Sequence, residues 1–143
     1  MSYELIYHSI AHKNNTSQDI IDIFNTTRAF NASKNITGCL LVHRDEFLHI
    51  IEGKKEDVLK LYEKTVNDER HTRPSVLEQG EIRERVFPEW IMAYRHTSDL
   101  EGNEVKGVMG IKDFEDYLKS MKKPTLAKKI FVNISKMMIH PFH

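Results

Sequence analysis

The chain of 143 residues has little of several features that define large classes of protein. It has one cysteine, Cys39, so no disulfide can form within the chain, which is typical of a reducing compartment. No apolar run approaches the ~18–20 residues that a membrane-spanning helix needs. The start lacks the charged, apolar and small-residue segments of a signal peptide, so we expect a cytoplasmic protein with no membrane partner.

Charge of one sign is not in excess either, because 21 basic residues are balanced by 21 acidic ones. This balance argues against a general nucleic-acid binder, which usually has a basic excess. The eight histidines show no tight metal-ligand spacing, so we expect no metal site. The sequence also lacks a glycine-rich phosphate loop and a nicotinamide fingerprint. Its length and ordinary composition predict one globular domain with a short appendage.

A β-hairpin is the clearest element that the sequence does contain. Two apolar runs, Ile36–Val42 and Phe47–Ile51, are separated by the polar residues 44–46, which is a good hairpin signal. His49 is the exception within the second run. A buried imidazole without hydrogen-bond partners costs about 1–3 kcal/mol, so we expect a polar group or a ligand to face it.

Hydrophobic periodicity predicts the elements around this hairpin. We expect helices from Thr16 or Ser17 to about Phe30 and from Glu56 to about Glu69, the second with an inner stripe of Val58, Leu61, Tyr62 and Thr65. The predicted strands are Tyr3–Ile10, an irregular one at Val76–Val86, and Trp90–Tyr94. This order predicts an α+β fold of the ferredoxin-like type, a βαββαβ core with an extra strand and both helices on one sheet face.

The opposite face of the predicted sheet is also apolar and must be covered. We therefore divide the chain into a core of residues 1–96 and a region of residues 97–143, a polar linker followed by two helices. These helices are predicted at Lys112–Met121 and Thr125–Met138, the second with a stripe of Leu126, Ile130, Ile134 and Met137 or Met138. They either fold back on the bare face or form an oligomer interface there.

Three polar side chains converge on the helix-covered side of the predicted sheet. Strand parity puts Tyr7 and His49 on the same face, and the first helix carries a stripe that ends in Thr27 and Asn31. Each of these residues, taken alone, also fits an ordinary core or helix-end position. Together, a phenol, an imidazole and a carboxamide between two helices suit a flat heteroaromatic ligand with donors and acceptors on its edge.

Several segments in register resemble the BLUF domains, the blue-light sensors that use FAD. They are LIYHS, NASKNITGCLLV, FLHIIEG, LYEKTVNDERH and FPEWIMAY, which together run from about Tyr3 to Arg95. The resemblance implies a flavin between the two helices, FAD with FMN or riboflavin as alternatives. It implies that Tyr7 donates an electron and a proton to the excited flavin and that Asn31 binds the pteridine edge. It further implies flavin contacts from Arg70 and His71 and a signal relay through Trp90 and Met92.

One position departs from the pattern of the family. BLUF domains carry a glutamine in the motif F-x-Q-x-x-E-G, and here that position is His49 in FLHIIEG. A glutamine amide can rotate or tautomerise and so rewire its hydrogen bonds, whereas an imidazole has no carbonyl and amine to exchange. It can accept from the Tyr7 hydroxyl and donate to the flavin. We expect flavin binding to survive, and the usual small red shift to be absent or replaced by flavin reduction through Tyr7.

The sequence leaves the output of such a sensor open. The tail is too short for a cyclase or phosphodiesterase domain, so we expect no enzyme activity, and signalling through a homo-oligomer or an unidentified downstream protein. The main alternative is an interaction module of the same fold that has lost light sensing. A flavin-dependent redox enzyme is a weaker alternative, because no nicotinamide fingerprint is present.

Overall fold

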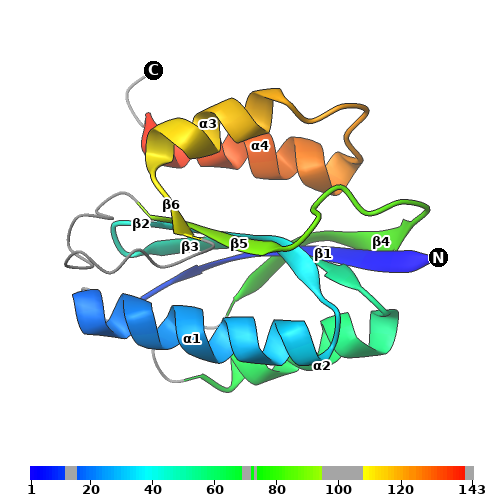
Figure 1. The fold of residues 1–143 in the computed structure, drawn as a ribbon, viewed down its shortest axis with the longest axis horizontal. Helices are drawn as coiled ribbons and strands as arrows, with labels where there is room; N and C mark the ends of the chain where they lie inside the picture. The colour runs from blue at the N-terminus through cyan, green and yellow to red at the C-terminus, as the bar shows by residue number, and fades with distance from the viewer. Residues whose placement is uncertain (12–15, 69–71, 73, 95–107, 141–143) are drawn as a thin grey trace.

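The computed structural model describes residues 1–11, 16–68, 72, 74–94 and 108–140, and it has three layers (Figure 1). A six-stranded sheet of order β4-β1-β3-β2-β5-β6 lies between two pairs of helices. The strands are β1 (Ser2–Ile10), β2 (Thr37–His43), β3 (Glu46–Gly53), β4 (Ser75–Ile82), β5 (Trp90–Tyr94) and β6 (Val108–Met109). The helices are α1 (Ser17–Ser33), α2 (Lys55–Val66), α3 (Ile111–Lys119) and α4 (Leu126–Ile139). This arrangement confirms the predicted α+β, ferredoxin-like fold.

The start of α1 is fixed by a capping box, as the sequence predicts. The Thr16 hydroxyl accepts from the Asp19 amide at 3.1 Å, and the Asp19 carboxylate accepts from the Thr16 amide at 2.9 Å. These bonds satisfy two amides that the helix leaves unpaired. The helix continues three residues beyond the predicted Phe30, so Asn31 lies in its last turn. By contrast, α2 ends at Val66, earlier than predicted, with Asn67 as its C-cap.

The register of the sheet places the middle of β3 at its centre. Because β3 pairs antiparallel with both β1 and β2, those two strands run parallel to each other. Tyr7 lies opposite His49, His49 opposite Leu40, and Leu40 opposite Met92, in one row across four strands. The structure therefore contains the predicted hairpin, and Tyr7 and His49 lie on the same face of the sheet as predicted.

A glycine in β2 allows this strand to pair closely with β3. Gly38 has a φ of 146°, and a Cβ atom there would collide with the carbonyl oxygen of Ile50. We expect Gly38→Ala to lower the free energy of unfolding by about 1–3 kcal/mol or more, because both the backbone conformation and the contact become strained. Urea unfolding followed by circular dichroism measures this loss. Gly80→Ala is the control, since its Cβ would meet nothing within 4 Å; an equal loss in both variants would contradict the argument.

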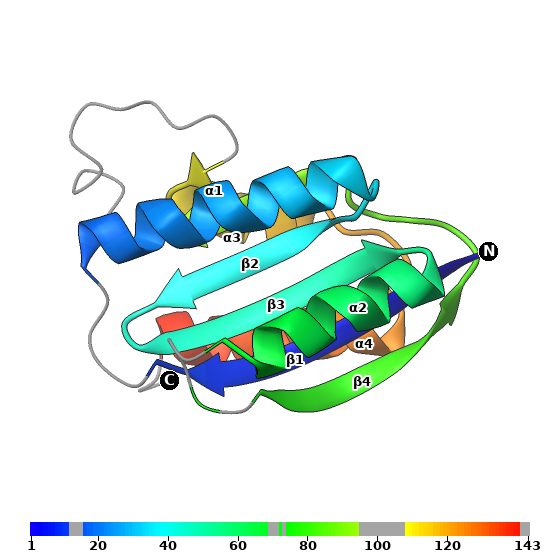
Figure 2. The same ribbon diagram turned by 90° about the horizontal axis from the view of Figure 1, so that it is seen from below.

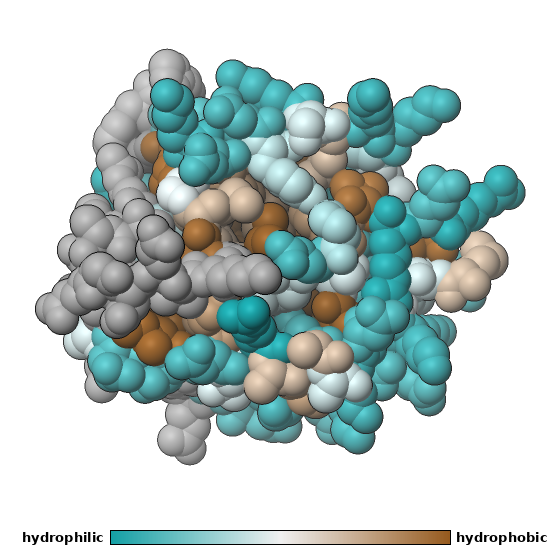
Figure 3. Space-filling view, viewed as in Figure 1, coloured by the Kyte–Doolittle hydropathy of each residue, from teal (hydrophilic) through white to brown (hydrophobic). Residues whose placement is uncertain are grey.

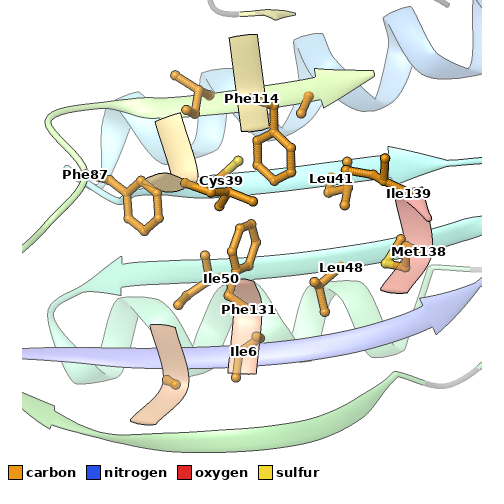
Figure 4. Close-up of a cluster of buried hydrophobic side chains, with 14 residues drawn as sticks. Ile6, Cys39, Leu41, Leu48, Ile50, Phe87, Phe114, Phe131, Met138 and Ile139 are labelled. Carbon is orange, nitrogen blue, oxygen red and sulfur yellow. The ribbon is translucent and has the colours of Figure 1, made fainter. Parts of the chain in front are cut away.

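The second face of the sheet is covered by α3 and α4 (Figure 1). Figure 4 shows Phe114 of α3 and Phe131 of α4 above Cys39 and Ile50 of the sheet. The two phenyl rings meet edge to face with centroids 5.9 Å apart. Burial of this apolar surface is the main force that holds the helical pair on the sheet.

The stripe predicted for α4 is wrong in part. Leu126 is 60% exposed and Met137 is 68% exposed. The residues of α4 that are buried are instead Ala127, Lys128, Phe131, Ser135, Met138 and Ile139. The helix is rotated in this way because Lys128, which the sequence pattern assigns to solvent, points into the protein and pairs with two carboxylates.

These carboxylates belong to Glu4 of β1 and Glu52 of β3. The Lys128 Nζ atom lies 2.8 Å from Glu4 Oε1 and 2.7 Å from Glu52 Oε2, and the side chains of Lys128 and Glu52 are fully buried. Glu52 also accepts hydrogen bonds from the hydroxyl of Thr37 and the amides of Val86 and Phe87. A buried charge requires this kind of pairing.

Two further details of the sheet differ from the predictions. The strand β4 ends at Ile82 rather than near Val86, because the Val86 amide donates to Glu52 instead of to a neighbouring strand. The strand β6 lies within the predicted linker and pairs in parallel with β5.

On the face shown in Figure 3, apolar side chains form small separate patches among hydrophilic ones. Within the described part of the chain, no helix is both long and apolar enough to span a bilayer.

Candidate functional site

A cleft lies between α1 and α2, the two helices on the sheet face that is seen in Figure 2. It contains about 450 Å³ of empty space that is partly open to solvent. Its lining consists of Tyr7, Ser9, Ile23, Thr27, Leu40, Phe47, His49, Leu61, Thr65 and Asp68. A second hollow of about 330 Å³ shares Thr27, Leu61, Thr65 and Asp68 with the cleft and adds Thr26, Phe30 and Lys64. The cleft combines apolar side chains with several polar ones, so it offers both apolar contact and hydrogen bonds to a small molecule.

Tyr7 and His49, which line the cleft, form a hydrogen-bonded group with Trp90. The Tyr7 hydroxyl lies 2.8 Å from His49 Nδ1, and the Trp90 indole N–H donates to His49 Nε2 at 2.9 Å. Both rings meet the imidazole edge to face, with centroids 5.3 Å away for Tyr7 and 6.1 Å away for Trp90. Both ring nitrogens of His49 therefore have protein partners, which answers the expectation of a polar group opposite this residue.

The Tyr7 hydroxyl is a neutral phenol at ordinary pH. Its pKa lies far above the usual value of 10, chiefly because the side chain is buried. The nearby carboxylate of Asp68 raises the pKa further. The phenolic proton therefore remains on Tyr7 until the residue is oxidised.

Asn31 has a buried carboxamide with no hydrogen-bond partner among the described residues. The residue is 1% exposed, and neither its oxygen nor its nitrogen is paired. The Ser9 hydroxyl, which lines the cleft, is likewise buried and unpaired in the described part of the chain. An unsatisfied buried polar group costs about 1–3 kcal/mol. A ligand that offers both a donor and an acceptor would remove this cost at Asn31.

The structure brings some of the predicted site residues together and leaves others apart. Tyr7, His49 and Thr27 line one cleft, whereas Asn31 lies outside its lining. Met92 is fully buried in the same row of the sheet as Tyr7 and His49. Arg70 and His71 lie outside the described residues.

Sequence reasoning did not assign Thr65 and Asp68 to the site. Both line the cleft, and Thr65 also contacts Tyr7. The signal for Thr65 was available, because a threonine on the inner stripe of the second helix is the same feature that identified Thr27 on the first. No periodicity identifies Asp68, because it lies beyond the end of α2.

Within the described residues, no group of three or more His, Cys, Asp or Glu side chains is placed to hold a metal ion.

Comparison with known proteins gives one family and several relatives. A family model described as "Sensors of blue-light using FAD" (BLUF) matches residues 2–93. The beta subunit of a photoactivated adenylate cyclase from Euglena gracilis is 35% identical over 89 residues, which are 62% of this chain. The chain spans only about 10% of the length of that relative.

Two solved structures extend the comparison to the fold. The dark-state structure of the BLUF protein BlrB is 29% identical, with a TM-score of 0.61 over 65% of this chain and 70% of that one. The photo-activated state of BlsA is 25% identical, with a TM-score of 0.65 over 94% of each chain. The second likeness includes the region of α3 and α4, because it extends over nearly the whole of both chains.

Proposed function

Because the chain belongs to the BLUF family, the sensors of blue light that use FAD, we propose that it is a flavin-binding photoreceptor with an atypical light response. The observation that carries this proposal is the cleft between α1 and α2, with a buried phenol and an imidazole at its floor. The unpaired carboxamide of Asn31 lies on the same side of the sheet.

The residues present fit a flavin. The ring system of a flavin has donors and acceptors along one edge, which match the unpaired oxygen and nitrogen of Asn31. Thr27 lines both the cleft and the outer hollow, so it suits a ligand that extends from one into the other. When bound, the flavin supplies absorption of blue light and a strong electron acceptor. FAD is the form that the family name implies, with FMN and riboflavin as alternatives.

In this proposal Tyr7 supplies an electron and its phenolic proton. The side chain is 4% exposed and faces the cleft, so solvent does not compete with a bound ligand for its hydroxyl. Its raised pKa keeps the proton in place in the dark. Arg70 and His71 remain proposed flavin contacts, and Trp90 and Met92 a proposed relay.

The atypical response follows from His49, which stands where the family carries its switching glutamine. Tyr7 and Trp90 already engage both nitrogens of the imidazole. Rotation of the ring about its axis exchanges no acceptor for a donor in the way an amide does. His49 therefore cannot form a second, equally good set of hydrogen bonds with Tyr7 and Trp90. The change in hydrogen bonds that a glutamine makes after light absorption then has no counterpart at this position.

The proposed output runs through the helices α3 and α4. The helices α3 and α4 cover the sheet face opposite the cleft, and α4 exposes Leu126 and Met137 to solvent. Exposed apolar side chains on an outer helix face suit contact with a second copy or with a downstream protein. The cyclase activity in the names of the Euglena relatives is not assigned to this chain, which corresponds to a small part of them.

Absorption spectroscopy tests the proposal directly. Protein purified in the dark and reconstituted with FAD is expected to be yellow. Blue light is expected to bleach it transiently, without the small red shift, as one electron and one proton pass from Tyr7 to the flavin and then return. Tyr7→Phe should bind flavin equally but bleach much more slowly, because the electron and proton donor is missing. A protein that stays colourless after reconstitution would favour the interaction module that has lost light sensing. A normal red shift in the wild type would refute the atypical response.

A further inference from the structure

The hydrogen bond from Trp90 fixes the tautomer of His49. An indole N–H can only donate, so His49 Nε2, 2.9 Å away, must accept and carries no proton. A neutral imidazole holds one proton on its ring, and this proton must then be on Nδ1. A doubly protonated His49 would place two N–H groups against each other and lose this bond. The side chains of both residues are buried, so this bond is shielded from bulk water.

The tautomer of His49 in turn decides the direction of its bond with Tyr7. Nδ1 carries the proton, so it donates to the Tyr7 oxygen across 2.8 Å. The proton of Tyr7 must then point elsewhere. The Thr65 Oγ1 atom lies 3.5 Å from the Tyr7 hydroxyl, a long contact. Tyr62 is the other hydroxyl-bearing neighbour of Tyr7, but within the described residues it contacts Tyr7 through its ring, and its hydroxyl donates to the carbonyl of Pro74.

Thr65 is prepared to accept this proton by its own helix. Its hydroxyl donates to the carbonyl of Leu61, one turn earlier in α2, at 3.1 Å. A threonine that bonds back in this way has its proton committed and a lone pair left for an incoming donor. The position is also on the cleft lining, next to Tyr7 and His49.

We propose that Trp90 and Thr65 together impose one direction on a chain of hydrogen bonds, in which Trp90 donates to His49, His49 to Tyr7, Tyr7 to Thr65, and Thr65 to the Leu61 carbonyl. Thr65 is thus a positioning residue that holds the phenolic proton of Tyr7 toward α2 and the cleft. His49 is a donor to Tyr7 and not its base, the reverse of the role expected from the sequence. The relevance of this chain to light sensing depends on the proposed function, whereas the chain itself does not.

Nitrogen-15 NMR of histidine-labelled protein tests the first half of the proposal. The wild type is expected to show His49 as the neutral Nδ1–H tautomer, with the His49→Gln spectrum identifying which signal belongs to this residue. Trp90→Phe removes the N–H group that donates to Nε2, so the tautomer is expected to invert to Nε2–H, which lets Nδ1 accept from Tyr7. A wild-type His49 that is already Nε2–H, or an unchanged tautomer in Trp90→Phe, would overturn the proposal.

Infrared spectroscopy of Tyr7 tests the second half. The C–O stretch of a phenol shifts when its hydroxyl loses an acceptor, and the difference between wild type and Tyr7→Phe isolates this one tyrosine. Thr65→Val keeps the shape of the side chain but removes the acceptor, so the band is expected to shift, and Thr65→Ser should restore it. Thr26→Val changes an exposed threonine on the facing helix and should leave the band in place. No shift in Thr65→Val would refute the role of Thr65.

Both measurements give an answer whether or not flavin is bound, provided that the flavin content of each sample is recorded. A colourless protein with the Nδ1–H tautomer and the Thr65-dependent band would refute the proposed function alone. A yellow, light-responsive protein with the opposite tautomer would refute the hydrogen-bond chain alone.

Discussion

His49→Gln is expected to give the flavin-loaded protein the small red-shifted state that is usual in its family, and which we expect the wild type to lack. A glutamine amide presents an acceptor on one side and a donor on the other, and a half-turn exchanges them. At this position the side chain lies between the Tyr7 hydroxyl and the Trp90 indole N–H, so the exchange alters both contacts at once. An imidazole can exchange donor and acceptor only by changing its tautomer, and the Trp90 N–H opposes this change. The substitution is therefore expected to convert the absence of a red shift into its presence.

His49→Asn is the matched control for this experiment. It carries the same amide on a side chain shorter by one methylene, so it cannot reach both Tyr7 and Trp90 from the same place on β3. We expect it to bind flavin without a red shift. Difference spectra recorded in the dark and after blue light, with recovery followed in time, measure the effect. A His49→Gln protein that binds FAD but forms no red-shifted state would show that a second feature of the cleft blocks the switch.

Lys128→Met is expected to lower the free energy of unfolding by about 3–5 kcal/mol, because it breaks a buried ion pair on one side only. The ammonium group lies within 2.8 Å of Glu4 and 2.7 Å of Glu52. Without it, two carboxylates remain close together in a region with little access to water. A loss of this size is a large fraction of the ~5–15 kcal/mol by which a typical domain is stable.

Lys129→Met is the natural control, because it changes the same residue type one position along α4 on the exposed side. We expect it to change stability by no more than about 0.5 kcal/mol. Guanidinium unfolding of both variants, followed by circular dichroism, gives the comparison. If the two variants are equally stable, the cluster contributes nothing and the orientation of α4 depends on its apolar contacts alone.

The buried group of Lys128, Glu4 and Glu52 lies between the strands of the sheet and α4. Glu52 accepts from the amides of Val86 and Phe87, which lie in the segment that leads into Trp90. On its other side Glu52 pairs with Lys128 of α4. Glu52 therefore contacts both the segment that precedes Trp90 and α4, which places it between the proposed light-sensing group and the proposed output region.

Local patterns in the sequence were sufficient for most of the fold. Alternation and helical periodicity depend on which residues must be buried, and this is a property of the segment itself. The capping box at Thr16 and the hairpin between β2 and β3 are of this kind, and the structure contains both. The shared face of Tyr7 and His49 also follows from strand parity once the hairpin is placed.

What the sequence by itself determined was therefore the order of elements, the family, and the face on which Tyr7 and His49 lie. Only the tertiary structure decided the rotation of α4 and the direction of the bonds around His49. The rotation depends on Glu4 and Glu52, which are far from Lys128 in the chain but adjacent to it in space. The direction depends on Trp90, 41 residues away, whose N–H can only donate. Periodicity reports which side of an element is buried, but a partner across the fold decides what a buried polar group does there.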